Sequence, residues 1–291
     1  MALNKTVFKT RAISAVVFAL LMLCGLLWNP WSFLLLFSII HMGCWWEYFN
    51  LLEKIHGTVF PRLQRLGFML MGFALMLSFC GPYYSLQGYG IRGNLVLPLS
   101  TAGFLLLAYS LLRSSHVLRP KAFAGAMAGI LYISLSWGLM LSLRQMGFVY
   151  KGQMLYADFG YLLPLVLIAS IWINDTMAYI VGSMIGRTPF SKISPKKTWE
   201  GTIGGAILAV VVVTAVAYFW LQTNWLQTAA VAATAAIVGT AGDLLESWLK
   251  RRAGVKDSGN MMPGHGGFLD RFDSMLLATP FVWLVVMLLQ A

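Results

Sequence analysis

The stretch GTIGGAILAVVVVTAVAYFWL, residues 201–221, decides the fold class of this 291-residue chain. It contains no charged residue. A helix of this length rises about 1.5 Å per residue and crosses about 30 Å of hydrocarbon. Strands of a membrane barrel would instead alternate apolar and polar residues over about ten positions. The stretch therefore predicts a membrane-spanning helix.

Eight further apolar segments accompany this one, and the overall composition agrees with them. Apolar residues make up 59% of the chain and charged residues only 11%, whereas soluble proteins carry about 25% charge. We expect an all-α, polytopic integral membrane protein with about nine transmembrane helices. The segments are roughly residues 12–28, 31–51, 63–80, 95–112, 122–143, 160–182, 201–221, 227–249 and 274–290.

The positive charges predict how these helices are oriented. With a cytoplasmic N-terminus, nine spans leave only Arg92, Arg144 and Lys151 of the 21 basic residues outside. Cytoplasmic loops carry the excess of Lys and Arg. We therefore expect the protein in the cell inner membrane, with its N-terminus in the cytoplasm and its C-terminus outside. The net charge of +11 is spread over short connectors, which speaks against nucleic acid as a partner.

The acidic residues divide the chain functionally. Seven of the ten lie beyond residue 170. We therefore interpret residues 1–160 as transmembrane scaffold and lipid contact, and residues 161–291 as a catalytic transmembrane region with cytoplasmic loops 187–200 and 250–273. Three isolated cysteines inside apolar segments, Cys24, Cys44 and Cys80, provide neither a disulfide framework nor a zinc site.

Three carboxylates fall inside predicted membrane helices. Asp175 lies in the sixth apolar segment, and Asp243 and Glu246 lie in the eighth. Each costs about 2.5 to 3.5 kcal/mol at mid-bilayer, so a cation, a basic partner or water must compensate it. Glu246 has Lys250 four residues on, which leaves an ion pair and a functional role equally open. Asp243 and Asp175 have no such neighbour.

A glycine-rich loop precedes the last apolar segment. Gly264, Gly266 and Gly267 surround His265, and a helix is expected directly afterwards. Backbone N–H groups of such a loop and helix start suit a phosphate. Asp270 and Asp273 share one face of the first turn and could approach a divalent metal, with helix capping as the alternative.

A third polar patch, SPKKTWEG at residues 194–201, precedes the seventh apolar segment. Its lysines either set the topology or bind a polyphosphate beside hydroxyls and glycines. From hydropathy and charge alone, we expect a membrane enzyme that handles a phosphorylated cytosolic substrate with a hard metal ion.

The stretch SWLKRRAGVKDSGNMMPGHGGFLDRFD, residues 247–273, closely resembles the signature of phosphatidate cytidylyltransferases, also called CDP-diacylglycerol synthases. The SPKKTWEG patch and the segment from Asp175 to Tyr179 resemble the same family in the expected order. The resemblance covers roughly residues 170–274. Met262, where the family usually has Ile, Leu or Phe, and Asn174, where it has a small residue, depart from the pattern.

The resemblance implies magnesium-dependent conversion of CTP and phosphatidate to CDP-diacylglycerol and pyrophosphate at the cytoplasmic face. It implies Asp243 and Asp270 as metal ligands, with Asp273 and Asp175 as second choices and a second cation left open. Catalytic charge neutralisation would come from Lys250, Arg251, Lys256 and Arg271. Substrate-binding positions would be Ser194, Lys197, Thr198, Ser247, Asp257, His265, Gly266 and Gly267.

Other functions stay open at this point. A CTP-dependent polyprenol kinase would transfer the γ-phosphoryl group, and a paralogue would use another phospholipid. A secondary transporter would also place carboxylates in the membrane, although it has no need of the long basic glycine-rich loop. The sequence also leaves a homodimer open.

Overall fold

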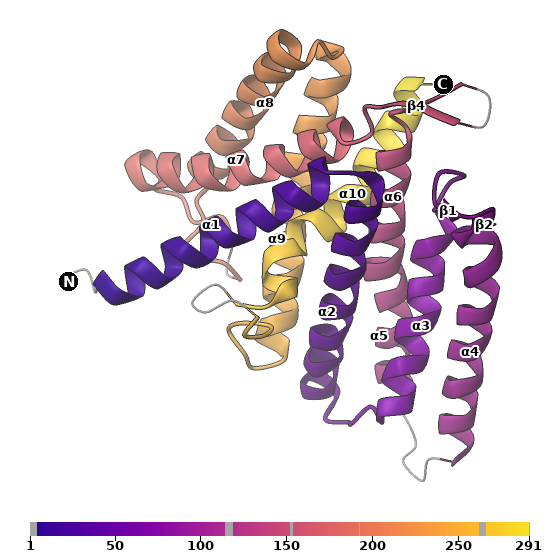
Figure 1. Ribbon diagram of the computed structural model, residues 1–291. Coiled ribbons are helices and arrows are strands. Elements are labelled where there is room, and N and C mark those ends of the chain that lie inside the picture. The colour runs from indigo at the N-terminus through magenta and orange to yellow at the C-terminus, as the bar shows by residue number, and fades with distance from the viewer. Residues whose placement is uncertain (1–4, 114–118, 152–153, 192, 262–265, 291) are drawn as a thin grey trace. The chain divides into compact units, whose positions relative to one another are not determined.

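The computed structural model describes residues 5–113, 119–151, 154–191, 193–261 and 266–290 (Figure 1). Most of these residues are helical. The helices are α1 Lys5–Leu27, α2 Pro30–His56, α3 Arg62–Ser78, α4 Ile91–Arg113, α5 Pro120–Gly129, α6 Ser136–Gln145, α7 Leu162–Ile185, α8 Trp199–Leu221, α9 Trp225–Arg252 and α10 Phe268–Gln290. A π-helical segment, η1 Ile130–Leu135, joins α5 to α6. Two short antiparallel hairpins complete the described chain: β1 Ser85–Leu86 with β2 Tyr89–Gly90, and β3 Phe148–Lys151 with β4 Met154–Asp158.

Each predicted apolar segment overlaps one helical stretch of the described residues, with α5, η1 and α6 acting as a single stretch. Six stretches in these ranges are long and apolar enough to cross a membrane: α4, the α5–α6 stretch, α7, α8, α9 and α10. The prediction of a helical, multi-pass membrane protein is confirmed. The number of nine spans and the orientation of the termini stay predictions.

The first two predicted apolar segments, 12–28 and 31–51, are separated at Asn29-Pro30, where hydrogen bonds cap the start of α2. Asn29 Oδ1 accepts from the N–H of Ser32 at 2.8 Å, and Ser32 Oγ accepts from the N–H of Asn29 at 3.1 Å. This reciprocal cap satisfies two N–H groups at the start of α2, and Pro30 needs no N–H partner in the first turn.

The chain divides into two compact units. The first contains Met1–Leu141 and Leu249–Phe272. In it, α3 packs closely on α4 at Gly67. A Cβ at this position would lie 2.9 Å from the carbonyl oxygen of Gly103, so the close approach requires a residue without a side chain. On α2, the imidazole Nε2 of His41 and the indole Nε1 of Trp45 each lie 2.9 Å from the hydroxyl of Ser134 in η1.

The second unit contains Ser142–Trp248 and Asp273–Ala291. Helices α7 and α8 pack through small residues, since a Cβ on Gly205 would lie 2.7 Å from the backbone nitrogen of Ala178. Close backbone approach of this kind is how small residues hold membrane helices together. Thr198 caps α8 by accepting from the N–H of Gly201 at 3.2 Å.

Candidate active site

The signature segment of the first unit begins where α9 ends. Gly254 has a left-handed φ of 68°, and its N–H donates to the carbonyl of Arg251 at 3.1 Å. The N–H of Val255 donates to the carbonyl of Lys250 at 3.0 Å. This Schellman pattern is accessible to glycine without strain. It ends α9 directly after the basic residues of its last turn, Lys250, Arg251 and Arg252.

Asp270, in the first turn of α10, is surrounded by hydrogen-bond donors. Its Oδ1 accepts from Lys250 Nζ at 2.7 Å. Its Oδ2 accepts from the N–H of Ser258 at 2.8 Å and from the N–H of Gly267 at 2.7 Å, and the Ser258 hydroxyl lies 2.9 Å away. Both carboxylate oxygens therefore have donors, and the side chain ties the loop to the start of α10.

Glu47 on α2 joins this network, which the sequence analysis missed. The carboxylate is buried, and it accepts from the backbone N–H groups of Phe268 and Leu269, each at 2.9 Å. The hydroxyl of Ser258 lies 2.7 Å from Glu47 Oε2. Glu47 has no basic residue three or four positions away in sequence. The criterion that singled out Asp243 would have found it.

Two glycines of the motif make room for these carboxylates. A Cβ on Gly267 would lie 2.2 Å from Glu47 Oε2, and one on Gly266 would lie 2.5 Å from Asp270 Oδ2. Gly266 also has a φ of 85°, which disfavours any side chain. In the described part of the loop, the N–H groups of Gly267, Phe268 and Leu269 thus serve carboxylates of the chain itself.

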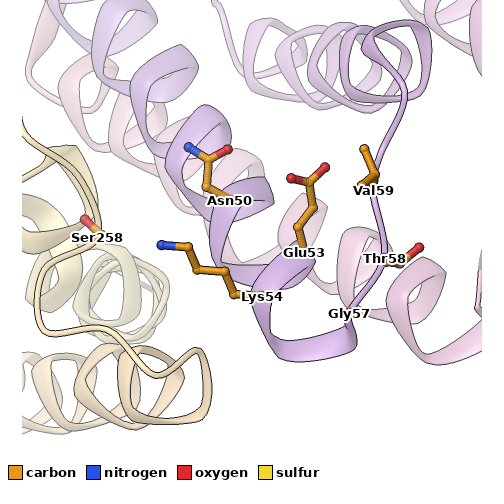
Figure 2. A pocket seen from close by; sticks show the side chains of 7 residues that line it. All are labelled: Asn50, Glu53, Lys54, Gly57, Thr58, Val59 and Ser258. Carbon is orange, nitrogen blue, oxygen red and sulfur yellow. The ribbon is translucent and has the colours of Figure 1, made fainter.

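A pocket of about 520 Å³, lined in part by Ser258, lies beside this network in the first unit. Figure 2 shows the side chain of Lys54 pointing toward the loop that carries Ser258, while the carboxylate of Glu53 points elsewhere. Glu53 forms an ion pair with Arg65, with 2.7 Å between Oε2 and Nη2. The pocket therefore offers hydrogen-bond donors next to the signature loop.

The other predicted carboxylates lie in the second unit. Asp243 of α9 and the buried Asp273 of α10 are close enough to share a hydrogen bond, and Asp175 of α7 is within electrostatic range of Asp273. Lys197 Nζ lies 2.7 Å from Asp243 Oδ2. Adjacent carboxylates repel each other unless a proton or a cation lies between them. The Lys197 ammonium supplies one positive charge at this point.

The donor chemistry of this second cluster suits a hard cation, because Mg²⁺ prefers oxygen ligands. Within the residues that the structure describes, no group of three or more His, Cys, Asp or Glu side chains is arranged to hold a metal ion. Mg²⁺ commonly uses one or two carboxylates and takes its remaining ligands from water and substrate phosphates. The pair Asp243 and Asp273 fits an ion bound in that way.

The remaining predicted site residues have varied surroundings. Arg251, Lys256 and Asp257 are exposed, while Ser194, Ser247 and Arg271 are half-buried. Arg251 Nη1 donates to the carbonyl of Val255 at 3.3 Å. Asp270 belongs to the first unit and Asp243 to the second. His265 lies outside the described residues.

Comparison with known proteins extends the similarity along the whole chain. Residues 9–289 match a family model described as the cytidylyltransferase family. A phosphatidate cytidylyltransferase of Brucella abortus is 32% identical over 279 residues, which cover 95% of this chain and 92% of that protein.

Two other similar proteins align over a shorter part. The phosphatidate cytidylyltransferase of Thermotoga maritima is 43% identical over 146 residues, 47% of this chain and 53% of its own length. That of a Synechocystis species is 45% identical over 131 residues, 45% of each chain. In these two alignments the chain spans about half the length of the relatives.

Proposed function

This chain belongs to the cytidylyltransferase family, and we propose that it is a membrane nucleotidyltransferase that makes CDP-diacylglycerol and pyrophosphate from CTP and phosphatidate. The observation that carries the proposal is the 279-residue similarity to the Brucella abortus phosphatidate cytidylyltransferase, which extends over nearly the whole of both chains. The side chains of the two clusters provide a chemistry that suits this reaction.

In the proposed reaction, an oxygen of the lipid phosphate attacks the α-phosphorus of CTP. A new bond forms between that oxygen and the phosphorus, and the bond to the β-phosphate oxygen breaks, so pyrophosphate leaves. No protein nucleophile is needed, and the protein contributes positioning and charge neutralisation. Lys250, Arg251, Lys256, Arg271 and Lys197 are the proposed sources of positive charge.

We propose Mg²⁺ as the cofactor. Bound Mg²⁺ would neutralise charge on the triphosphate. The closeness of Asp243 and Asp273 supports a place for it in the second unit, with Asp175 nearby. The proposal that Asp270 is a metal ligand rests on the family resemblance. Lys250 donates to Asp270 Oδ1, so this hydrogen bond would have to break before that oxygen could bind an ion.

We further propose nine spans, a cytoplasmic N-terminus and an active site that faces the cytoplasm from a cell inner membrane. The distribution of 18 basic residues inside against three outside supports this orientation. CTP would then reach the site from the cytoplasm, and the acyl chains of phosphatidate would stay in the bilayer. The division into a scaffold up to residue 160 and a catalytic region beyond it is part of the same proposal.

The test uses purified protein in detergent with phosphatidate and CTP labelled at either the α- or the γ-phosphorus. We expect the α-label in the lipid product and the γ-label in released pyrophosphate. A γ-label in the lipid would replace the proposal with a lipid kinase. Absence of CTP turnover with any phospholipid would remove the enzyme assignment in favour of a transporter.

A further inference from the structure

We infer that Glu47, in the N-terminal half of the chain, is a positioning residue that fixes the signature loop and the first turn of α10 in their working geometry. The rate measurements that test this inference rest on the proposed function, whereas the hydrogen-exchange measurement does not. Its basis is a set of contacts within the first unit, between α2 and residues 258–270.

The Glu47 carboxylate behaves as an internal anion at a helix start. It accepts two backbone N–H groups of the α10 N-terminus, from Phe268 and Leu269. These groups have no partner within a helix, and the helix dipole favours a negative charge beside them. The side chain is only 6% exposed. In the described ranges no lysine or arginine pairs with it, so the donors of the signature segment compensate its burial.

Ser258 connects Glu47 to Asp270. Its hydroxyl lies 2.7 Å from Glu47 Oε2 and 2.9 Å from Asp270 Oδ2, and its single proton serves one of them at a time. Its backbone N–H also donates to Asp270. The position of Asp270, and through it that of Lys250, therefore depends on a network that Glu47 anchors.

The glycine spacing of the motif supports the same conclusion. Cβ atoms on Gly259 and on Gly267 would each lie 2.2 Å from an oxygen of Glu47. Real Cβ atoms do not approach so closely, so both positions need glycine while the Glu47 carboxylate is in place. These glycines thus accommodate a side chain of α2, a role that is separate from contact with a substrate phosphate.

The first arm of the test measures steady-state rates and melting temperature for Glu47→Gln, Ser258→Ala and the control Ser134→Ala. Ser134 is a buried serine that also contacts α2 side chains, but it lies away from the signature loop. We expect kcat to fall about tenfold or more in the first two variants, because small misplacements of reacting groups cost rate. The KM values for CTP and lipid and the control rate should stay close to those of the unchanged protein.

The second arm measures hydrogen exchange at the amides of residues 266–272, which needs no catalytic activity. Glu47→Gln should speed exchange by about tenfold at one of the two amides, Phe268 or Leu269, because an amide nitrogen would replace the oxygen that this amide donates to while the other oxygen is kept. Ser134→Ala should leave it unchanged. Unchanged exchange in Glu47→Gln would overturn the inference, even if the reaction proved to be a different one.

The double variant Glu47→Gln/Ser258→Ala separates a shared network from two independent effects. Its kcat should lie within about twofold of the slower single variant, because both substitutions break one link. Multiplying effects would overturn the link through Ser258, and a kcat per folded molecule equal to that of the unchanged protein would overturn the positioning role. If Glu47→Gln does not fold, the steady-state rates and the hydrogen exchange of Ser258→Ala, each compared with Ser134→Ala, test the inference in its place.

Discussion

Asp270 and Asp273 lie three residues apart at the start of α10, yet their surroundings are opposite in kind. Asp270 is surrounded by donors from Lys250, Ser258 and Gly267. Asp273 is buried next to another carboxylate, that of Asp243. A carboxylate with a full set of donors is stable without an ion, whereas adjacent carboxylates need a proton or a cation between them. One short motif therefore supplies both an anchor and a candidate ion ligand.

The largest loss of activity is expected at the proposed ion-binding carboxylates, Asp243 and Asp273. Asp243→Asn removes one of the two adjacent charges, and we expect turnover of CTP to fall by about 10²-fold or more. The melting temperature should hold or rise, since repulsion with Asp273 is relieved. Pyrophosphate release by the purified variant measures the rate. A rate close to that of the unchanged protein would remove Asp243 from the proposed metal site.

Comparing Asp270→Asn with Asp273→Asn sharpens the contrast directly. Asp270→Asn leaves the Lys250 ammonium, whose side chain is 13% exposed, without its carboxylate, and removing one partner of such a pair is destabilising. We expect both lower activity and a lower melting temperature. Asp273→Asn should lower activity without lowering the melting temperature. Equal thermal stability of the two variants would contradict the distinction between anchor and ion ligand.

A smaller effect is expected at Lys197, whose ammonium contacts Asp243 at 2.7 Å. Lys197→Met removes a positive charge next to two carboxylates, and the rate should fall by about tenfold. Lys197→Arg keeps the charge and should restore part of the rate. A matched Lys196→Met variant separates this contact from general loop charge. Equal losses in the two methionine variants would indicate that only the net charge of the loop matters.

The smallest effect on activity, and the clearest on topology, is expected from cysteine labelling in a Cys24→Ser background. Val59 and Leu86 are exposed, at 73% and 63%. With the N-terminus in the cytoplasm, Val59→Cys should react only after the membrane is permeabilised, and Leu86→Cys should react in intact cells. The reverse pattern would overturn the proposed orientation.

Local features of this molecule could be read from the sequence because they depend on neighbouring residues. The apolar segments are of this kind, and each predicted segment overlaps a helix in the described chain. The resemblance of residues 247–273 to a family signature likewise needed only contiguous residues.

The contacts that organise the candidate site could not be predicted in this way. Glu47 and Ser258 are separated by 211 positions, and no sequence period indicates that α2 reaches the signature loop. The glycines around Gly266 were interpreted as a phosphate cradle, whereas in the structure Gly267 leaves space for the Glu47 carboxylate. Pairing of Lys197 with Asp243 also depends on tertiary folding.

The most direct test of the central claim is the stoichiometry of the reaction in detergent. Purified protein is incubated with CTP and Mg²⁺ and with phosphatidate, a polyprenol or a non-phosphorylated diacylglycerol. We predict one pyrophosphate released for each cytidylylated lipid formed, with phosphatidate alone as acceptor. Release of CDP in place of pyrophosphate, or equal turnover without phosphatidate, would contradict the account.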